Sequence, residues 1–306
     1  MDFVHIKLFK DIANTKSISR AAQLHGISQS AATQRVQELE KTLKVRLLDR
    51  GRRPLVLTDA GRLFYDFCRE VLRHKEDFDV SLDRLKGRLE GVVRVASIYS
   101  VGISELSHLE QVFSSRLPSA ELRIEYLRPE RIYEVILSEQ ADLGLLSYPE
   151  ASRDIKVIPW REEEMVVAVS PGHSLAAKER VEPVDLTGED YVGFDDDLPI
   201  SRGLKRFFRE HRVEVNPVMH FDNIQMIKEA VALGSGVSIL PACALRFEIA
   251  QGRLVAVPLA PPGLRRPLGI IHLRRKRFNQ ATLSFLHLLK EEPLATQISG
   301  QLPVVP

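Results

Sequence analysis

The side chains best suited to recognising another molecule are gathered in residues 28–35. Six polar residues stand there on a stretch with helical periodicity: Ser28, Gln29, Ser30, Thr33, Gln34 and Arg35. Hydroxyl, amide and guanidinium groups on one helix face are the donors and acceptors that read base edges in DNA. Val36 and Leu39 continue an apolar stripe that would bury the other face. The segment therefore predicts a DNA recognition helix.

A helix-turn-helix is the element that would position these side chains. Residues 17–24 predict a short helix, and Gly26 ends it because glycine enters a left-handed turn without a Cβ penalty. Ser28 is a suitable N-cap for the second helix. Small residues at the helix crossing and polar residues early in the second helix are typical of this motif. A plain helical hairpin inside a larger core is the alternative that these residues alone leave open.

A basic hairpin is predicted directly after the recognition helix. Between residues 45 and 58, two short apolar runs flank a Gly-Arg-Arg-Pro tip. We expect Arg52 and Arg53 to contact phosphates or to enter the minor groove, as the wing of a winged helix does. A solvated loop is the alternative. Residues 1–58 carry eleven Lys and Arg against five Asp and Glu, which favours an anionic partner and, with the motif, double-stranded DNA.

A long amphipathic helix is predicted from residue 59 to the high 80s. Its apolar seam consists of a seven-residue repeat and one flanking leucine: Phe64, Val71, Phe78, Leu85 and Leu82. A helix of this length without an obvious globular partner usually pairs with a second copy as a coiled coil. We therefore expect these residues to mediate dimerisation. The alternative is a helix that lies on its own domain.

Beyond residue 91 the predicted strands and helices alternate, which indicates an α/β fold with largely parallel sheets. One of the predicted strands covers residues 164–170. About 200 residues are many for one sheet, so two lobes are expected. The predicted crossings between them lie at 147–150 and near 255–267. The predicted domains are residues 1–58, a linker helix at 59–90, and 91–306, with lobe I at about 91–147 and 267–295 and lobe II at about 148–266.

Several segments resemble the LysR-type transcriptional regulators. The matching stretches are residues 17–31, 39–40, 46–50 and 57–61 near the N-terminus, and 141–145 and 232–241 further on. The resemblance implies a winged helix-turn-helix, a dimerisation helix, and a two-lobed effector domain similar to periplasmic binding proteins. It also implies a homodimer or homotetramer on DNA, a small-molecule inducer, and contact with RNA polymerase.

The recognition helix departs from the family pattern at three places. Ser30 stands where the family often has proline, and Ala32 stands where a bulky leucine often follows. The usual Ser-Arg-Gln run is here Thr33-Gln34-Arg35. Docking on a roughly two-fold symmetric DNA site is still expected. The base preferences of the family are not transferred to this chain.

The resemblance places the ligand between the lobes, held by helix N-termini and strand ends. Residues of suitable chemistry at such positions are Ser97, Tyr99, Ser100, Arg128, Ser147, Ser201 and Asn223. Serine hydroxyls and backbone N–H groups suit a carboxylate or another oxyanion, and arginine offers a bidentate fork. Ordinary helix caps are the alternative for the serines and the asparagine, and a surface ion pair for the arginine. The aspartates 195–197 are interpreted as a solvated loop, and the basic run 274–277 as an exposed turn.

Composition and motifs narrow the remaining function classes. The chain of 306 residues is 44% hydrophobic and 27% charged, with no apolar run long enough for a membrane span and no signal-peptide layout. Its two cysteines are far apart and predict neither a disulfide framework nor a metal site. We expect a cytoplasmic protein that uses no cofactor and binds no metal.

No nucleophile elbow, phosphate loop or metal-ligand set is present in the sequence, so an enzyme is not expected. The alternatives are a two-lobed solute-binding protein or enzyme with a helical appendage, and an architectural DNA binder, which would need no ligand cleft. The sequence predicts instead a DNA-binding transcriptional regulator controlled by a small, anionic metabolite.

Overall fold

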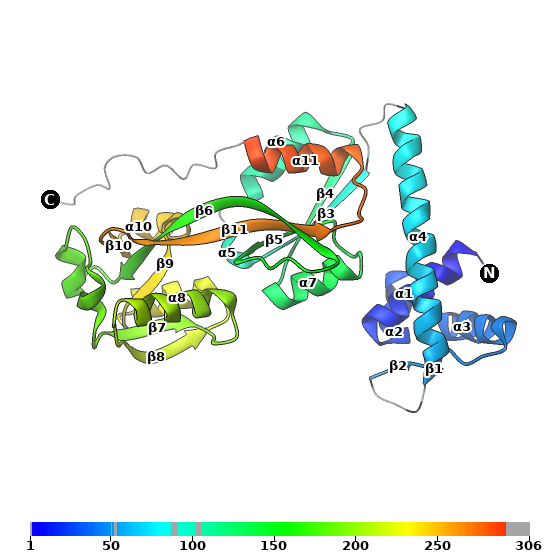
Figure 1. Ribbon diagram of the computed structural model, residues 1–306, viewed down its shortest axis with the longest axis horizontal. Helices are drawn as coiled ribbons and strands as arrows, with labels where there is room; N and C mark the ends of the chain where they lie inside the picture. The colour runs from blue at the N-terminus through cyan, green and yellow to red at the C-terminus, as the bar shows by residue number, and fades with distance from the viewer. Residues whose placement is uncertain (1, 50, 52–53, 87–90, 102–105, 292–306) are drawn as a thin grey trace. The chain divides into compact units, whose positions relative to one another are not determined.

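The computed structural model divides the chain into two compact units, Met1–Arg88 and Leu89–Pro306 (Figure 1). Each unit has its own hydrophobic core, as expected because 306 residues exceed what one core accommodates. Among the described residues, no helix is long and apolar enough to cross a membrane. The structure describes the chain except for residues 1, 50, 52–53, 87–90, 102–105 and 292–306.

Unit 1 is a winged helix-turn-helix followed by a long helix. Its elements are α1 (Phe3–Thr15), α2 (Ile18–Leu24), α3 (Gln29–Leu43), β1 (Leu48–Asp49), β2 (Val56–Leu57) and α4 (Asp59–Lys86). The side chains of Ser17 and Ser28 accept hydrogen bonds from backbone N–H groups in the first turns of α2 and α3. Gly26 has a φ of +63° at the turn between them, which explains the glycine. The predicted winged helix-turn-helix is confirmed.

The core of unit 1 forms where α1, α2, α3 and the first turns of α4 meet. Ala21 and Ala32 are fully buried, and their short side chains let the helices approach closely. Phe64 of α4 packs edge-on against Phe9 of α1, with ring centroids 5.0 Å apart. These contacts hold the recognition helix α3 in a fixed orientation within unit 1.

Unit 2 combines a seven-stranded sheet, a two-stranded sheet and surrounding helices (Figure 1). Its strands are β3 (Gly91–Ser97), β4 (Ala120–Tyr126), β5 (Leu143–Ser147), β6 (Ile155–Val169), β7 (Asp190–Phe194), β8 (Asn216–Phe221), β9 (Ser238–Pro241), β10 (Val255–Pro258) and β11 (Leu264–Leu273). Its helices are α5 (Tyr99–Val101), α6 (Ser107–Arg116), α7 (Pro129–Leu137), α8 (Pro199–Glu210), α9 (Ile224–Ala232), α10 (Arg246–Ala250) and α11 (Gln280–Glu291), with 3-10 turns η2 (Ser174–Ala177), η3 (Pro183–Leu186) and η4 (Ala242–Leu245).

The larger sheet is mixed rather than largely parallel. Its strand order is β10-β6-β11-β5-β3-β4, with β9 also paired to β6. Strand β3 is parallel to β4 and β5, whereas β6 pairs antiparallel with β9, β10 and β11. The expectation of largely parallel sheets is therefore wrong for this part. The reason is that the chain leaves along β6 and returns along its neighbour β11 in the opposite direction.

Two hydrophobic cores divide unit 2 into two lobes that share β6 and β11. Lobe I contains β3, β4, β5, α6, α7 and α11, and lobe II contains β7 to β10, α8 and α9. Ile155 at the start of β6 is buried in the core of lobe I, whereas Met165 to Val169 are buried in that of lobe II. The chain therefore crosses between the lobes within the strands themselves. The first crossing lies within β6, after the predicted segment 147–150, and the second lies between Leu264 and Leu268 of β11, at the end of the predicted segment near 255–267.

The irregular middle of β6 explains why sequence pattern alone found only its second half. Pro159 and the charged residues 161–164 interrupt the apolar run. The β6–β11 register shifts between Leu268 and Gly269, opposite this proline. A bulge there makes the missing proline N–H tolerable in an interior strand.

A glycine turn joins α9 to β9 and so positions α9 in lobe II. Gly234 and Gly236 have φ angles of +82° and +144°. A Cβ at Gly236 would lie 2.3 Å from the backbone oxygen of Asp190, so only glycine fits this close approach of two backbone segments.

Candidate functional site

The polar side chains of the recognition helix differ in whether they already form hydrogen bonds within the protein. The Ser28 hydroxyl caps α3 and lies 2.9 Å from that of Ser30, and the Thr33 hydroxyl donates to the backbone oxygen of Gln29 over 2.8 Å. In contrast, the side chains of Gln29 and Arg35 make no hydrogen bond to any residue that the structure describes. These two side chains have donors to offer to a partner.

Gln34 is also exposed, and its amide makes a long contact of 3.4 Å to a carboxylate oxygen of Glu38. Such a weak exposed contact exchanges readily with water or with a base edge. Gln34 therefore joins Gln29 and Arg35 as the best candidates for base contacts among the six residues indicated by the sequence.

The hairpin beside α3 is short, with Leu48 opposite Leu57 and Asp49 opposite Val56. Arg52 and Arg53, predicted to contact DNA from its tip, lie outside the described residues. An open groove of about 1000 Å³ runs between α3, the hairpin and the start of α4. Arg46 and Arg62 line this groove and are exposed, and they add two basic side chains to those that the sequence indicates for DNA contact.

The apolar seam of α4 serves two different purposes along its length. Phe64 is 8% exposed in the core of unit 1, and Val71 packs partly against that core. Phe78 is 64% exposed and Leu82 is half-buried. The side chain of Leu85 lies outside the described ones. Phe64 is thus a core residue of its own domain, because the first turns of α4 pack on α1, and Phe78 is the clearest exposed member of the predicted dimerisation seam.

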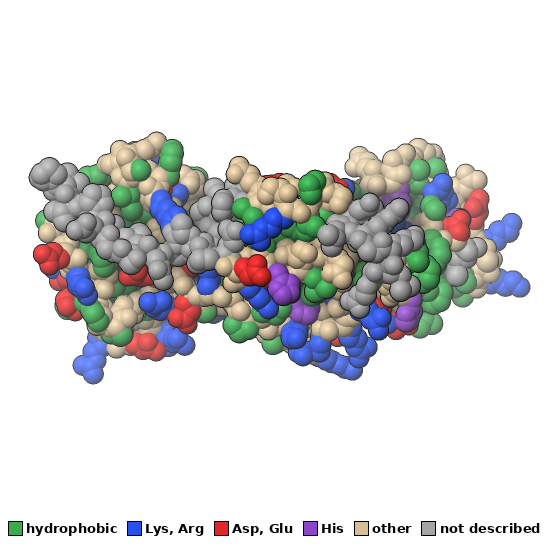
Figure 2. Space-filling view, turned by 90° about the horizontal axis from the view of Figure 1, so that it is seen from above, with side chains coloured by type: hydrophobic (Ala, Val, Ile, Leu, Met, Phe, Trp, Pro, Cys, Tyr) green, Lys and Arg blue, Asp and Glu red, His purple; other side chains and the backbone are tan. Residues whose placement is uncertain are grey.

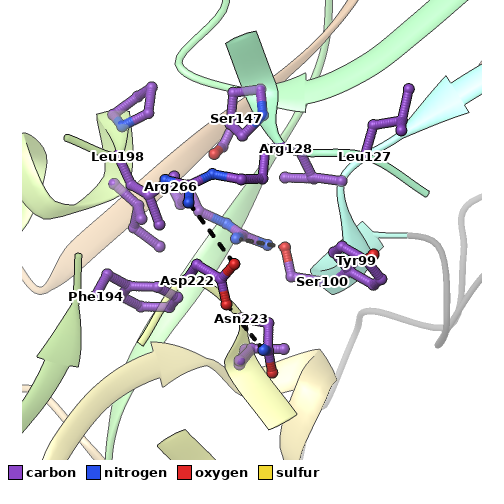
Figure 3. A pocket seen from close by; sticks show the side chains of 15 residues that line it. Tyr99, Ser100, Leu127, Arg128, Ser147, Phe194, Leu198, Asp222, Asn223 and Arg266 are labelled. Carbon is purple, nitrogen blue, oxygen red and sulfur yellow. Dashed lines mark hydrogen bonds and ion pairs between the residues drawn. The ribbon is translucent and has the colours of Figure 1, made fainter. Parts of the chain in front are cut away.

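A cleft in unit 2 lies where strand ends of the two lobes meet (Figure 3). Five of the predicted effector residues line it: Tyr99, Ser100, Arg128, Ser147 and Asn223. They follow or end β3, β4, β5 and β8, as expected for parallel strands whose carboxyl ends open onto a crevice. The cleft leaves about 40 Å³ to the centres of water-sized molecules, which is room for only a few waters.

Two predicted effector residues do not line this cleft. Ser97 is 0% exposed and its hydroxyl donates to the backbone oxygen of Ile98 over 3.1 Å. Ser201 is 5% exposed in the first turn of α8. Both side chains are buried, whereas their neighbours Ser100 and Ile200 line the cleft.

Arg266 lines the cleft and was missed by the sequence reasoning. It is 1% exposed in β11 and directly opposite Glu163 of β6, which is equally buried. Its Nε donates to a Glu163 carboxylate oxygen over 3.0 Å, Nη2 forms an ion pair with the same oxygen, and Nη1 donates to the Ser100 hydroxyl over 3.0 Å. The Arg265-Arg266 pair directly before the apolar run 267–271 is the signal that could have indicated it, because alternate residues of a strand point to opposite faces and one of the two must point inward.

The carboxylate of Glu163 is shared by further polar groups. Arg161 donates to its other oxygen over 3.3 Å, and the Cys243 thiol lies 3.5 Å from the same oxygen. The Arg161 guanidinium stacks over the ring of Trp160, with 4.1 Å to the centroid. This buried cluster therefore combines two arginines with one glutamate just beneath the cleft.

Arg128 projects from the start of α7 in lobe I toward two carboxylates of lobe II. Its Nη2 lies 2.7 Å from Asp197, and its Nη1 lies 3.7 Å from Asp222. Asn223 caps α9 by accepting from the N–H of Met226 over 3.1 Å, and its amide donates to Asp222 over 3.0 Å (Figure 3). Arg128 thus forms the surface ion pairs weighed as the alternative, yet it also lines the cleft.

Ion pairs are common elsewhere on the surface, where Lys and Arg are interspersed with Asp and Glu (Figure 2). Arg131, one turn after Arg128, forms an ion pair with Glu134 on its own helix. The contacts of Arg128 to Asp197 and Asp222 differ because they connect the two lobes.

Comparison with known proteins identifies the family. The family described as "LysR substrate binding domain" matches residues 86–293, and "Bacterial regulatory helix-turn-helix protein, lysR family" matches residues 3–62. The chain belongs to the LysR family. It is 25% identical over 287 residues to the RuBisCO operon transcriptional regulator of Allochromatium vinosum, across 94% of this chain and 95% of that protein. As a LysR-family member, the chain is a DNA-binding transcriptional regulator with an effector-binding domain.

Solved structures show the same fold for this LysR-family chain. Full-length OxyR from Pseudomonas aeruginosa gives a TM-score of 0.71 at 20% identity, across 95% of this chain and 93% of that one. Full-length CbnR in complex with its target DNA gives a TM-score of 0.62 at 20% identity, across 94% and 99%.

Other chemically notable residues of this LysR-family chain serve its fold. Burial raises the pKa of the Cys243 thiol to about 12, and that of Cys68 to about 12 as well, so neither is a thiolate at neutral pH. Asp196 contacts Lys205 over 2.6 Å. In the basic run 274–277, expected to be an exposed turn, the ammonium of Lys276 is buried and lies 3.3 Å from Asp142, because this carboxylate inside lobe I needs compensating charge.

Proposed function

We propose that this LysR-family regulator is controlled by a small anionic metabolite bound in the cleft between lobes I and II. The observation that carries the proposal is that two arginines, Arg128 at the start of α7 and Arg266 in β11, line one cleft together with the serines Ser100 and Ser147. Guanidinium groups bind carboxylate and phosphoryl oxygens in a bidentate manner, and hydroxyls complete the hydrogen bonding.

Arg266 is suited to act as the anchor at the floor of the cleft. Of its five N–H donors, three are used within the protein, two toward Glu163 and one toward Ser100. One N–H on each terminal nitrogen is left for a ligand. Because Glu163 fixes the guanidinium from behind, little side-chain entropy is lost when an anion binds.

An anion screen on the full-length chain tests the proposal. Thermal unfolding and calorimetric titration against small carboxylates, sulfate and phosphate should find at least one anion that binds. Arg128→Gln should weaken that binding by about tenfold or more, since a charge-assisted hydrogen bond contributes about 1.5–3 kcal/mol. The matched control Arg131→Gln, which removes an exposed arginine one turn away, should leave affinity unchanged. Binding only by neutral or cationic compounds would contradict the proposal.

We further propose that unit 1 delivers this signal to double-stranded DNA. Gln29, Gln34 and Arg35 are the proposed base-reading residues, supported by their position on α3 and their available donors. Self-association through the exposed seam around Phe78 would place two recognition helices on a roughly two-fold symmetric site. We also propose that the regulator acts in the cytoplasm and contacts RNA polymerase there.

A further inference from the structure

The arginine at the mouth of the cleft is already surrounded by carboxylates of its own chain. Asp197 and Asp222 of lobe II lie 2.7 and 3.7 Å from the Arg128 guanidinium, and Glu130 of lobe I lies 3.9 Å away. An anion that approaches Arg128 therefore competes with the carboxylate bound at Nη2 and meets the negative charge of the other two carboxylates. The first two contacts also connect lobe I to lobe II, so replacing them changes what holds the lobes together.

We propose that Asp197 and Asp222 compete with the effector for Arg128, so that the cleft selects an anion with two negative charges and its binding releases this contact between the lobes. The inference rests on the proposed function, because it concerns the same cleft. It adds the charge of the ligand and the way in which binding is transmitted.

The charge requirement follows from a count of the groups at the rim. A monocarboxylate would exchange one carboxylate for another at Arg128 and would still meet the negative field of Asp222, so its net gain is small. A phosphoryl group or a dicarboxylate brings a second charge, which can reach Arg266 at the floor while the first engages Arg128. Both arginines line the cleft (Figure 3).

The exchange is readily reversible because the displaced groups return to water easily. The side chain of Asp197 is 65% exposed and that of Asp222 is 45% exposed, so both carboxylates rehydrate when Arg128 leaves. Asp222 also keeps its hydrogen bond from Asn223. Exposed pairs of this kind contribute little each, so an effector of ordinary affinity can displace them.

The first test needs no ligand. Spin labels at Gln140→Cys in lobe I and Glu210→Cys in lobe II report the distance between the lobes of the full-length chain, with labelled chains diluted into unlabelled ones. Cys68 and Cys243 are buried and should not take up label. The Asp197→Asn/Asp222→Asn variant should shift the distance distribution toward longer values. An unchanged distribution would overturn the inference, whatever the ligand proves to be.

The second test uses inorganic phosphate and acetate as probes at pH 8 and equal ionic strength. The wild-type chain should bind phosphate and discriminate against acetate. The double variant should bind phosphate about three- to tenfold more tightly, as expected when one or two exposed ion pairs no longer compete. The ratio of its affinities for phosphate and acetate should also be smaller than in the wild type.

A matched control removes an equivalent pair within lobe II. Asp196→Asn abolishes the exposed contact with Lys205 without crossing the cleft, and phosphate affinity should stay at the wild-type value. If the wild-type chain binds phosphate through Arg128 but the double variant binds no more tightly, the inference is wrong and the proposed function stands. If neither the wild type nor the double variant binds any anion, the proposed function is wrong. The distance measurement then still tests whether Asp197 and Asp222 hold the two lobes together.

Discussion

The buried ion pair beneath the cleft allows a quantitative prediction. Glu163→Leu removes the carboxylate that both Arg266 and Arg161 contact. The side chains of these two arginines are only 1% and 15% exposed, so water cannot replace the lost carboxylate without repacking. A buried charge that loses its partner destabilises a protein by about 3–5 kcal/mol. For a unit of about 200 residues, one kcal/mol shifts the Tm by about 2–4 °C, so the Tm of unit 2 should fall by roughly 6–20 °C.

Thermal and urea unfolding followed by circular dichroism measure this effect. The double variant Glu163→Leu/Arg266→Met replaces both partners by apolar side chains and should recover much of the lost stability. The control Glu164→Leu changes the adjacent, exposed glutamate and should alter stability by less than about 0.5 kcal/mol. The reasoning is refuted if Glu163→Leu is as stable as the wild type within about 1 kcal/mol, or if the double variant is less stable than the single one.

Three shorter predictions concern a turn, a histidine and the recognition helix. Gly236→Ala should destabilise the protein by more than about 3 kcal/mol, because its Cβ would lie 2.3 Å from the backbone oxygen of Asp190. Gly234→Ala, whose Cβ would have no atom within 4 Å, should cost only about 1–2 kcal/mol. Urea unfolding of the two variants measures both losses. Burial lowers the pKa of His272, although a backbone hydrogen bond acts in the opposite direction. As the pH falls, this histidine is therefore protonated at a higher pH in the unfolded chain than in the folded one. Stability should therefore fall as the pH is lowered through about 6.5, and His272→Phe should reduce that slope. Arg35→Ala should weaken binding to a selected duplex by about 1–3 kcal/mol and leave binding to random duplex unchanged in fluorescence anisotropy, while equal losses on both would assign Arg35 to phosphates.

Local signals determine most of unit 1. Ser17 and Ser28 cap helices through hydrogen bonds to N–H groups three residues on, and Gly26 supplies the left-handed turn between the helices. Each of these interactions spans only a few residues, so residue type and spacing predicted both helices and the turn between them. The same holds for the start of α4 at residue 59, where the Thr58 hydroxyl accepts a hydrogen bond from the N–H of Gly61.

The cleft was predicted in part, for a related reason. Strand ends and helix starts can be located from sequence, and Tyr99, Ser100, Arg128, Ser147 and Asn223 were found at them. Whether a side chain at such a position faces the cleft or the core depends on one residue of register. That is why neither Ser97 nor Ser201 lines it.

By itself, the sequence determined the helix-turn-helix, the long helix and the alternation of strands and helices, because these depend on neighbours along the chain. Only the tertiary structure decided that β6 and β11 cross between the lobes and that Arg266 meets Glu163, 103 positions away. It alone brought Arg128 to Asp197, 69 positions along the chain. The first pair forms because burial and the antiparallel register of two distant strands bring it together, and the second forms because the two lobes pack against each other. No local pattern of residues encodes either meeting.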